Sequence, residues 1–210
     1  AHITFETAAA GTTGERLRID SAGKILINHT TGRGVGNANV RLLQVEGTGG
    51  DSGVAVVRNS NNGSGAALTL GKSRSSSVGG NTIVQDGDKL GVISFAGADG
   101  VDLQSTAAQI TCEVDGTPGA DDMPGRLVFK TTADGNASAG ERLRITSAGF
   151  VGIGSDDPGN MLDIYNEDGT DCLKLNVSTA AGGSNKQNAI RFSVDSTVKA
   201  HMGLAVDAGR

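Results

Sequence analysis

The feature that most constrains the fold of this chain is an alternation of apolar and polar side chains that recurs along the sequence. Leu17 and Ile19, for example, alternate with Arg16 and Arg18. Successive side chains of a β-strand point to opposite faces, so a period of two is the signature of a strand with one apolar face. Segments rich in Gly, Asn, Asp and Ser separate the runs, and no window of the sequence has the apolar spacing of a helix. We therefore predict an all-β fold, with strands at 2–6, 15–19, 24–28, 107–114, 126–131, 141–145 and 150–154.

The sequence also contains a long internal repeat. Residues 141–154 (ERLRITSAGFVGIG) repeat residues 15–28 (ERLRIDSAGKILIN), and the second copy begins 126 positions after the first. The similarity extends upstream and, more faintly, downstream of this stretch. A repeat at the spacing of a domain indicates a serial array of one structural unit. We predict a first β repeat unit over 1–124 and a second, incomplete unit over 125–210, and we expect the chain to be part of a longer protein.

The repeated stretch has a clear physical interpretation as a strand, a tight turn and a return strand. In ERLRI the arginines project to one face and the leucine and isoleucine to the other. The glycine of each SAG turn suits a positive φ, and two glycines of the second return strand leave one face bare, which favours close approach of another backbone. The candidate residues of this structural repeat motif are Glu15, Arg16, Leu17, Arg18, Ile19, Gly23, Glu141, Arg142, Leu143, Arg144, Ile145, Gly149, Gly152 and Gly154.

The first copy of the repeat departs from the second in its return strand. Residues 25–28 read ILIN where residues 151–154 read VGIG, and no proline follows the first copy. If the glycines mark a close approach of backbone, the first copy must be packed differently.

The composition limits how much of a core one chain can build. Glycine occurs 33 times, whereas there are five Phe, one Tyr and no Trp. Large apolar side chains supply most of the burial in a core, roughly 1.5–3 kcal/mol for each one that is fully buried. We therefore expect thin layers that are buried against other chains. The net charge of −5 is spread along the sequence and the apolar runs are short, so we predict neither nucleic-acid binding nor membrane insertion.

Motifs that could carry catalysis lack the partners that their chemistry requires. The GDSG at 50–53 resembles a protease nucleophile loop, but no histidine stands in a suitable motif before it. The LGKS at 70–73 resembles a phosphate-binding loop, yet Ala66 replaces the required glycine and the residues before Lys72 alternate as a strand. We predict that the chain has no catalytic residues and is not an enzyme.

Metal and redox chemistry are not predicted either. Cys112 and Cys172 are expected to be free thiols, and the three histidines lie too far apart for zinc spacing. Acidic turns at 86–88, 121–122 and 167–171 could hold calcium through oxygen ligands, with solvated carboxylates as the favoured interpretation. We therefore predict no cofactor and assign no metal ligand.

Residues 116–166 carry a series of motifs in a fixed order. A GRLxFxTTxDG strand and loop leads to ERLRIxSxG, then to VGIG, a proline and an LxI strand. This series resembles the recurring module of tailed-phage fibre proteins, including those of marine and cyanobacterial phages. The residues that match the pattern are 125–129, 131–132, 134–135, 141–145, Ser147, Gly149, 151–154, Pro158, Leu162 and Ile164. Residues 88–100 and 107–119 also resemble the strands that precede the module in that family.

The resemblance implies an elongated, intertwined homotrimer attached to a virion. On this basis we expect an extracellular virion fibre, assembled in the host cytoplasm, that is bound to other virion proteins of the baseplate, collar or capsid. Its expected function is that of a phage tail fibre or spike shaft that supports host-surface attachment, with a host glycan or protein as receptor. Two alternatives are a carbohydrate-active trimeric spike, which would need paired carboxylates in a cleft, and a repeat-built bacterial surface adhesin or filament subunit.

Overall fold

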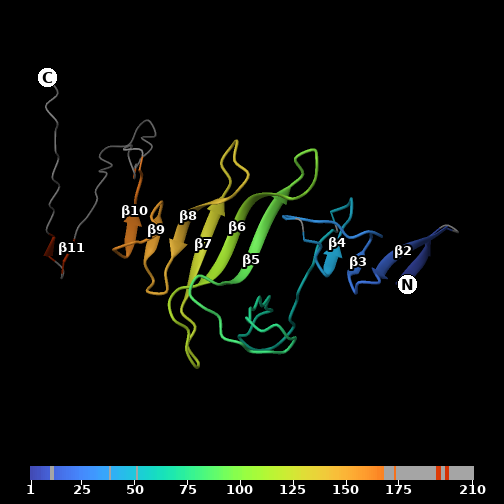
Figure 1. The fold of residues 1–210 in the computed structure, drawn as a ribbon, viewed down its shortest axis with the longest axis horizontal. Helices are drawn as coiled ribbons and strands as arrows, with labels where there is room; N and C mark the ends of the chain where they lie inside the picture. The colour runs from blue at the N-terminus through green and yellow to red at the C-terminus, as the bar shows by residue number, and fades with distance from the viewer. Residues whose placement is uncertain are drawn as a thin grey trace, which may run out of the picture. The chain divides into compact units, whose positions relative to one another are not determined.

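The structure is a computed structural model of the chain, and it is entirely β in the part that it describes (Figure 1). The described residues are 1–9, 12–37, 39–50, 52–167, 173, 193–194 and 197–198. They contain no helix, and hence no helix long and apolar enough to cross a membrane. The all-β prediction is confirmed. The chain divides into two compact units, Ala1–Glu167 and Asp168–Arg210.

The first unit begins with a four-stranded sheet in which neighbouring strands are also consecutive in sequence. The first three strands pair antiparallel, whereas the last pair is parallel. The strands are β1 (Ile3–Ala9), β2 (Thr12–Ile19), β3 (Ile25–Ile27) and β4 (Leu43–Val45).

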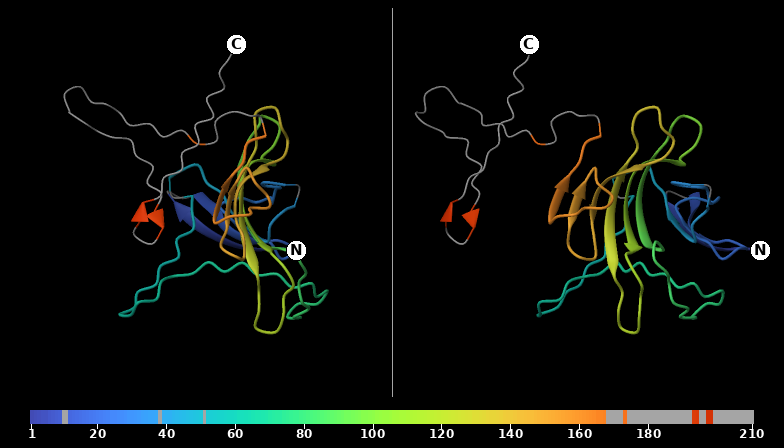
Figure 2. Two further views of the ribbon diagram at one scale, coloured as in Figure 1. Left: turned by 90° about the vertical axis from the view of Figure 1, so that its left-hand side faces the viewer. Right: turned by 60° about the vertical axis from the view of Figure 1, so that its left-hand side comes forward.

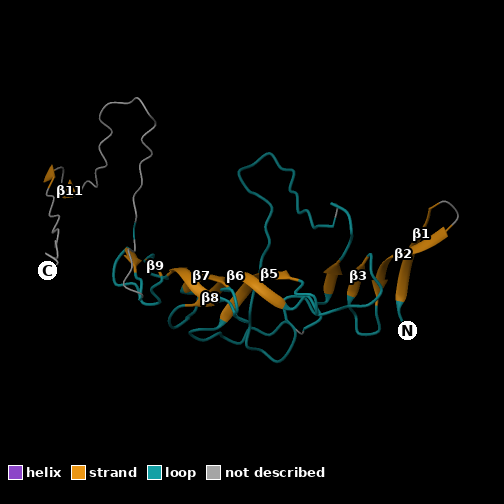
Figure 3. Cartoon of the chain, turned by 90° about the horizontal axis from the view of Figure 1, so that it is seen from above, coloured by secondary structure: helices purple, strands orange, loops and turns teal. Residues whose placement is uncertain are grey.

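A six-stranded sheet follows, with the order β10-β9-β8-β7-β6-β5. Five strands pair antiparallel in sequence, and the sixth pairs parallel with its neighbour. The strands are β5 (Lys89–Gly97), β6 (Ser105–Val114), β7 (Gly125–Thr131), β8 (Gly140–Ile145), β9 (Val151–Ile153) and β10 (Leu162–Ile164). Figure 3 shows in teal the long loop that leads from the first sheet to β5.

The second unit is described over residue 173 and two short strands. These are β11 (Ser193–Val194) and β12 (Thr197–Val198), which pair antiparallel. The expected free thiol of Cys172 lies outside the described residues, whereas Cys112 is a free, half-buried thiol on β6.

All seven predicted strand ranges coincide with observed strands, although their ends differ by a few residues. β4, β5 and β10 of the first unit were not among these ranges; in β5, apolar residues occupy both faces and blur the alternation. β6 and β7 pair across residue 124, so one sheet takes strands from both predicted repeat units. The boundary at 124/125 between copies of the sequence repeat therefore stays a prediction.

Few side chains of the first unit are fully buried. Those with essentially no exposure are Leu26, Val114, Val128 and Thr111. Many large apolar side chains of the strands are exposed by a third or more of their area. This agrees with the small number of large side chains in the composition and with an expectation of thin layers.

Candidate functional site

The two copies of the sequence repeat form the same four-strand arrangement. β1–β4 correspond to β7–β10, with two antiparallel pairs followed by a parallel pair in each set. The register is also the same, since Arg18 pairs with Leu26 and Arg144 pairs with Gly152. Even the bulge recurs, between Phe5 and Glu6 in one copy and after Phe129 in the other. The sequence repeat is therefore a structural repeat in the described strands.

The glutamate and second arginine of each ERLRI strand pair with each other. The Arg18 guanidinium donates to both carboxylate oxygens of Glu15 at 2.6 Å. Arg144 donates in the same way to Glu141, at 2.5 and 2.8 Å, and also to the backbone carbonyl of Asp156. The hydrogen bonds to Glu141 raise the pKa of Arg144. These arginines thus pair within their own chain.

The first arginine of each motif reaches the strand before it. Arg16 donates to the Thr7 hydroxyl at 2.8 Å, and Arg142 donates to the Thr131 hydroxyl at 3.0 Å. Arg142 is exposed, so this contact lies at the surface.

The motif turns are held by glycine in the left-handed region. Gly23 has a φ of 77° and Gly149 a φ of 80°, a conformation that favours glycine. Each glycine N–H donates back to a carbonyl at the start of its turn, from Gly23 to Asp20 at 3.0 Å and from Gly149 to Thr146 at 2.9 Å. The turn has the same shape in both copies, and it sets the register of the return strand.

The return strands differ where the sequences differ. In the second copy, a Cβ at Gly152 would collide with the carbonyl oxygen of Ser155, and one at Gly154 with that of Tyr165. In the first copy, Leu26 is fully buried, and Gly32 of a longer connection lies over its side chain. Asn28 takes a positive φ of 64° and donates its side-chain amide to the Glu46 carbonyl at 3.0 Å. A close backbone approach in one copy is therefore replaced by buried side chains in the other.

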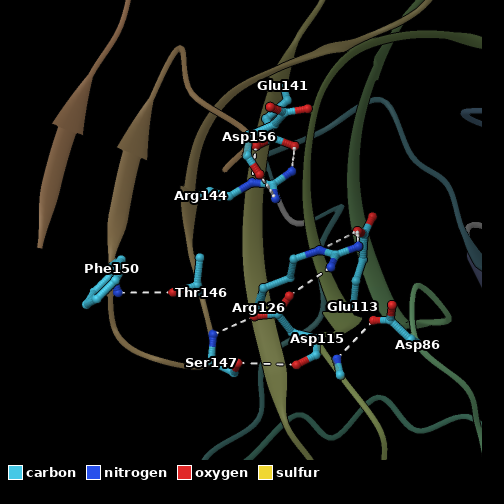
Figure 4. Close-up of polar contacts among 11 residues, drawn as sticks. Asp86, Glu113, Asp115, Arg126, Glu141, Arg144, Thr146, Ser147, Phe150 and Asp156 are labelled. Carbon is cyan, nitrogen blue, oxygen red and sulfur yellow. Dashed lines mark hydrogen bonds and ion pairs between the residues drawn. The ribbon is translucent and has the colours of Figure 1, made fainter. Parts of the chain in front are cut away.

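Charged side chains converge on one face of the six-stranded sheet (Figure 4). Arg126 donates to Glu113 at 3.0 and 3.1 Å and to Asp115 at 2.9 Å. Ser147, in the turn of the repeat motif, donates its backbone N–H to Asp115 at 2.7 Å. Partial burial works to raise the pKa of Asp115, but the Ser147 N–H and Arg126 outweigh it and lower the pKa. This network, which sequence analysis missed, ties the motif turn to β6 and β7.

The opposite face of the same sheet is apolar across all six strands. Residues paired in register point to the same side, so the register identifies the members of this face. We call it the apolar face; its members are Gly91, Ile93, Phe95, Ala108, Ile110, Cys112, Leu127, Phe129, Leu143, Ile145, Val151, Ile153, Leu162 and Ile164.

The apolar face is open over much of its area. Phe95 is 53% exposed, Ile93 45% and Leu162 57%. The four-stranded sheet has the same character, since Ile3, Ile19, Ile25 and Leu43 lie side by side in register and all but Ile19 are exposed. Alternation indicated that each strand had an apolar side, but only the sheet order shows that these sides form a continuous surface.

Part of the apolar face is covered by the connection that precedes β5. Leu68 and Leu70 line a shallow pocket together with Ile93, Ile110 and Cys112. The absence of a side chain at Gly91 makes room for Leu70, whose Cβ lies 2.7 Å from the position that a Cβ of Gly91 would take. The remainder of the face has no such cover within the described part of the chain.

The motifs that resemble catalytic loops make local contacts only. The hydroxyl of Ser52 donates to the carbonyl of Gly49 at 2.9 Å, and Lys72 Nζ donates to the carbonyl of Ser73 at 2.7 Å. Among the acidic turns, Asp88 accepts a bidentate pair from Arg74 at 2.6 and 2.8 Å. Within the described ranges no group of three or more metal-ligating side chains is present.

The fold is similar to that of solved phage tail-fibre domains. The carboxy-terminal domain of the bacteriophage T5 L-shaped tail fibre matches with a TM-score of 0.60 and 14% sequence identity, over 89% of this chain and 75% of that one. The form of that domain with its intramolecular chaperone domain matches with a TM-score of 0.58 and 14% identity. That match covers 92% of this chain and 55% of the other, so this chain spans about half its length. No protein-family model and no curated protein sequence matches. The resemblance to tail-fibre proteins is thereby confirmed at the level of the fold.

Proposed function

We propose that this chain forms part of the shaft of a tailed-phage fibre, in which three parallel copies support attachment of the virion to a host surface. The observation that carries the proposal is the apolar face, a continuous surface of aliphatic and aromatic side chains left open in the single chain. Similarity of fold to a phage tail-fibre domain supports the same role.

The apolar face requires a partner for energetic reasons. Completing the burial of each half-exposed Leu, Ile or Phe stabilises the assembly by roughly 1 kcal/mol. Six such side chains of the face are exposed by more than a third, so association is strongly favoured over exposure to water; they are Ile93, Phe95, Leu127, Ile145, Ile153 and Leu162. Closed rotational symmetry lets identical copies cover one another's apolar faces without leaving an unpaired apolar surface exposed. Three copies around a long axis meet this requirement and place the charged face, with Arg126 and Arg144, outward.

Partners and location follow from the same role. The fibre is anchored to other virion proteins at the baseplate, collar or capsid, and is exposed outside the host cell after assembly in its cytoplasm. A host-surface glycan or protein is the receptor at the far end of the fibre. The shaft has a mechanical task, and no catalytic step forms part of this proposal.

The assembly is tested by sedimentation equilibrium and light scattering of the intact protein. We expect three times the mass of one chain. Ile153→Asp places a charge on the apolar face, where the wild-type side chain is 39% exposed, and is expected to dissociate the trimer. Val101→Asp, at a loop residue that is 90% exposed, is the matched control and should leave the mass unchanged. A stable, compact wild-type monomer would contradict the proposal.

The virion role is tested separately by immunogold electron microscopy of phage particles with antibodies raised against this chain. Label on slender appendages is the expected result. Label confined to the bacterial surface would instead favour the adhesin alternative.

A further inference from the structure

The connection between β4 and β5 contains an extended segment without a backbone partner. We call residues 53–70 the arm. Figure 2 draws it, cyan to teal, as a long excursion with a sharp bend. Within the described part of the chain, no residue of the arm belongs to a strand or makes a backbone-to-backbone hydrogen bond. Long connections without secondary structure are uncommon in compact domains and usually serve a function.

The arm has the sequence of a strand that needs a partner. Its first run, 53–60 (GVAVVRNS), contains a cluster of valines, of which Val54 is 72%, Val56 59% and Val57 77% exposed. β-branched residues fit a pleated sheet, and so high an exposure of three neighbouring valines is costly in water. The bend after the run is locally ordered, since the Asn62 side chain accepts hydrogen bonds from Ser64 N–H at 3.0 Å and from the Ser60 hydroxyl at 3.1 Å. The run itself has no pairing partner among the described residues.

The second run of the arm shows which surface these side chains fit. Leu70 lies against the apolar face beside β5, where Gly91 leaves space for it, and Leu68, which is 78% exposed, borders the same shallow pocket. The arm and the apolar face are therefore chemically matched. Among the described residues the first run shows no comparable contact, since Val54, Val56 and Val57 are each more than half exposed.

β5 offers the complementary edge. Among the described strands it is an edge strand that pairs with β6 alone, and at nine residues it is far longer than β10, the opposite edge. An open, long and apolar edge is a template for adding a strand from another chain. The first run and β5 are close in length, and each residue of a strand adds about 3.3 Å, so the two can pair along almost their whole extent.

We propose that the first run of the arm adds as a strand to the β5 edge of a second copy of this chain. Val54 and Val56 then continue the apolar face beside Ile93 and Phe95, and Val57 lies on the other face with Val92. This inference rests on the proposed trimer, because the exchange requires a neighbouring copy. It names the segment that links one copy to the next.

Cysteine cross-linking tests the exchange in the full chain. With Cys112 and Cys172 replaced by serine, Val56→Cys is combined with Ile93→Cys or Phe95→Cys, and the protein is oxidised and run on a non-reducing denaturing gel. We expect covalent dimers and trimers. The control combines Val78→Cys with Ile93→Cys, since Val78 is fully exposed in a turn outside the arm, and it should give uncross-linked monomer.

A second measurement uses charge in place of a cross-link. The double variant Val54→Asp/Val56→Asp is expected to raise the trimer dissociation constant at least tenfold, whereas Val78→Asp leaves it within twofold of the wild type. Cross-links confined to single chains would show that the arm returns to its own β5 and would overturn the inference. If the wild type is a trimer but the cysteine variants do not cross-link and the aspartate variant keeps its affinity, the inference is also overturned, while the proposed function stands. A monomeric wild type would instead overturn the proposed function, and the exchange with it.

Discussion

Leu26 and Gly152 occupy the same register position in the two copies of the repeat, each opposite the second arginine of its ERLRI strand. Leu26 is fully buried beneath a long connection that includes Gly32. Gly152 lies directly under the carbonyl of Ser155, because its connection turns back at once. At this register position the space above the strand is therefore filled by a leucine side chain in one copy and by the backbone of the following connection in the other.

Gly152→Val is expected to disrupt the second copy. The new side chain would collide with the Ser155 carbonyl, which belongs to the backbone and cannot simply rotate away. Overpacking of this kind costs about 1–3 kcal/mol or more. Arg142→Ala removes only an exposed contact to Thr131 and should cost less than about 1 kcal/mol. Thermal unfolding by circular dichroism compares the two, and equal losses would contradict the packing described for Gly152.

Leu26→Ala is expected to destabilise the first copy strongly. The side chain has no exposed area, so its loss leaves a cavity under the connection and costs about 2–5 kcal/mol. Leu42→Ala removes the same atoms from a residue that is 69% exposed and serves as the control, with an expected change near zero. Denaturant unfolding at fixed protein concentration measures both. A small effect of Leu26→Ala would mean that the connection does not pack as described.

Thr111→Val is expected to raise stability. The Thr111 hydroxyl is fully buried and has no hydrogen-bond partner in the part of the chain that the structure describes. An unsatisfied buried hydroxyl is unfavourable, so replacing it with a methyl group should gain about 1 kcal/mol. Thr106→Val is the matched comparison, because that hydroxyl donates to the Gly36 carbonyl at 2.9 Å and its loss should be destabilising. Differential scanning calorimetry should show a higher melting temperature for Thr111→Val and a lower one for Thr106→Val.

Acid is expected to lower the stability that the loop between β5 and β6 contributes to the fold. The Asp99 carboxylate accepts hydrogen bonds from the Asp102 N–H, the Ser105 hydroxyl and the Val101 N–H, which lower its pKa to about 2 from an ordinary 3.8. A lowered folded-state pKa stabilises the fold above the ordinary value, and this contribution is lost as pH falls from 3.8 towards 2.

Melting temperatures measured at about pH 7, 4 and 2 should therefore fall mainly in the last interval. Asp99→Asn should reduce that fall, since the variant side chain does not titrate. Asp134→Asn, at an exposed loop residue, should not change it. An identical acid dependence in the wild type and Asp99→Asn would show that other carboxylates are responsible.

Local sequence was sufficient to predict most of the strands and the turns of the repeat. Alternation located β1 to β3 and β6 to β9, because a strand's side-chain period is visible in a single segment. It did not locate β4, β5 or β10; in β5, the adjacent Val92 and Ile93 put apolar side chains on both faces. The residues directly before Lys72 were expected to alternate as a strand, but they are unpaired among the described residues, since pairing depends on a partner that a local pattern cannot supply.

The sequence by itself determined the repeat, the turn glycines and the alternation of each strand, which are local properties of the chain. Tertiary structure decided how those strands combine. Only the register shows that Arg126 lies between Glu113 and Asp115, because these contacts join different strands. Only the sheet order shows that the apolar sides of six strands form one open surface, with the β5 edge unpaired beside it. The physical reason is that burial and pairing depend on which segments meet in space, whereas propensity and periodicity depend on neighbours in sequence.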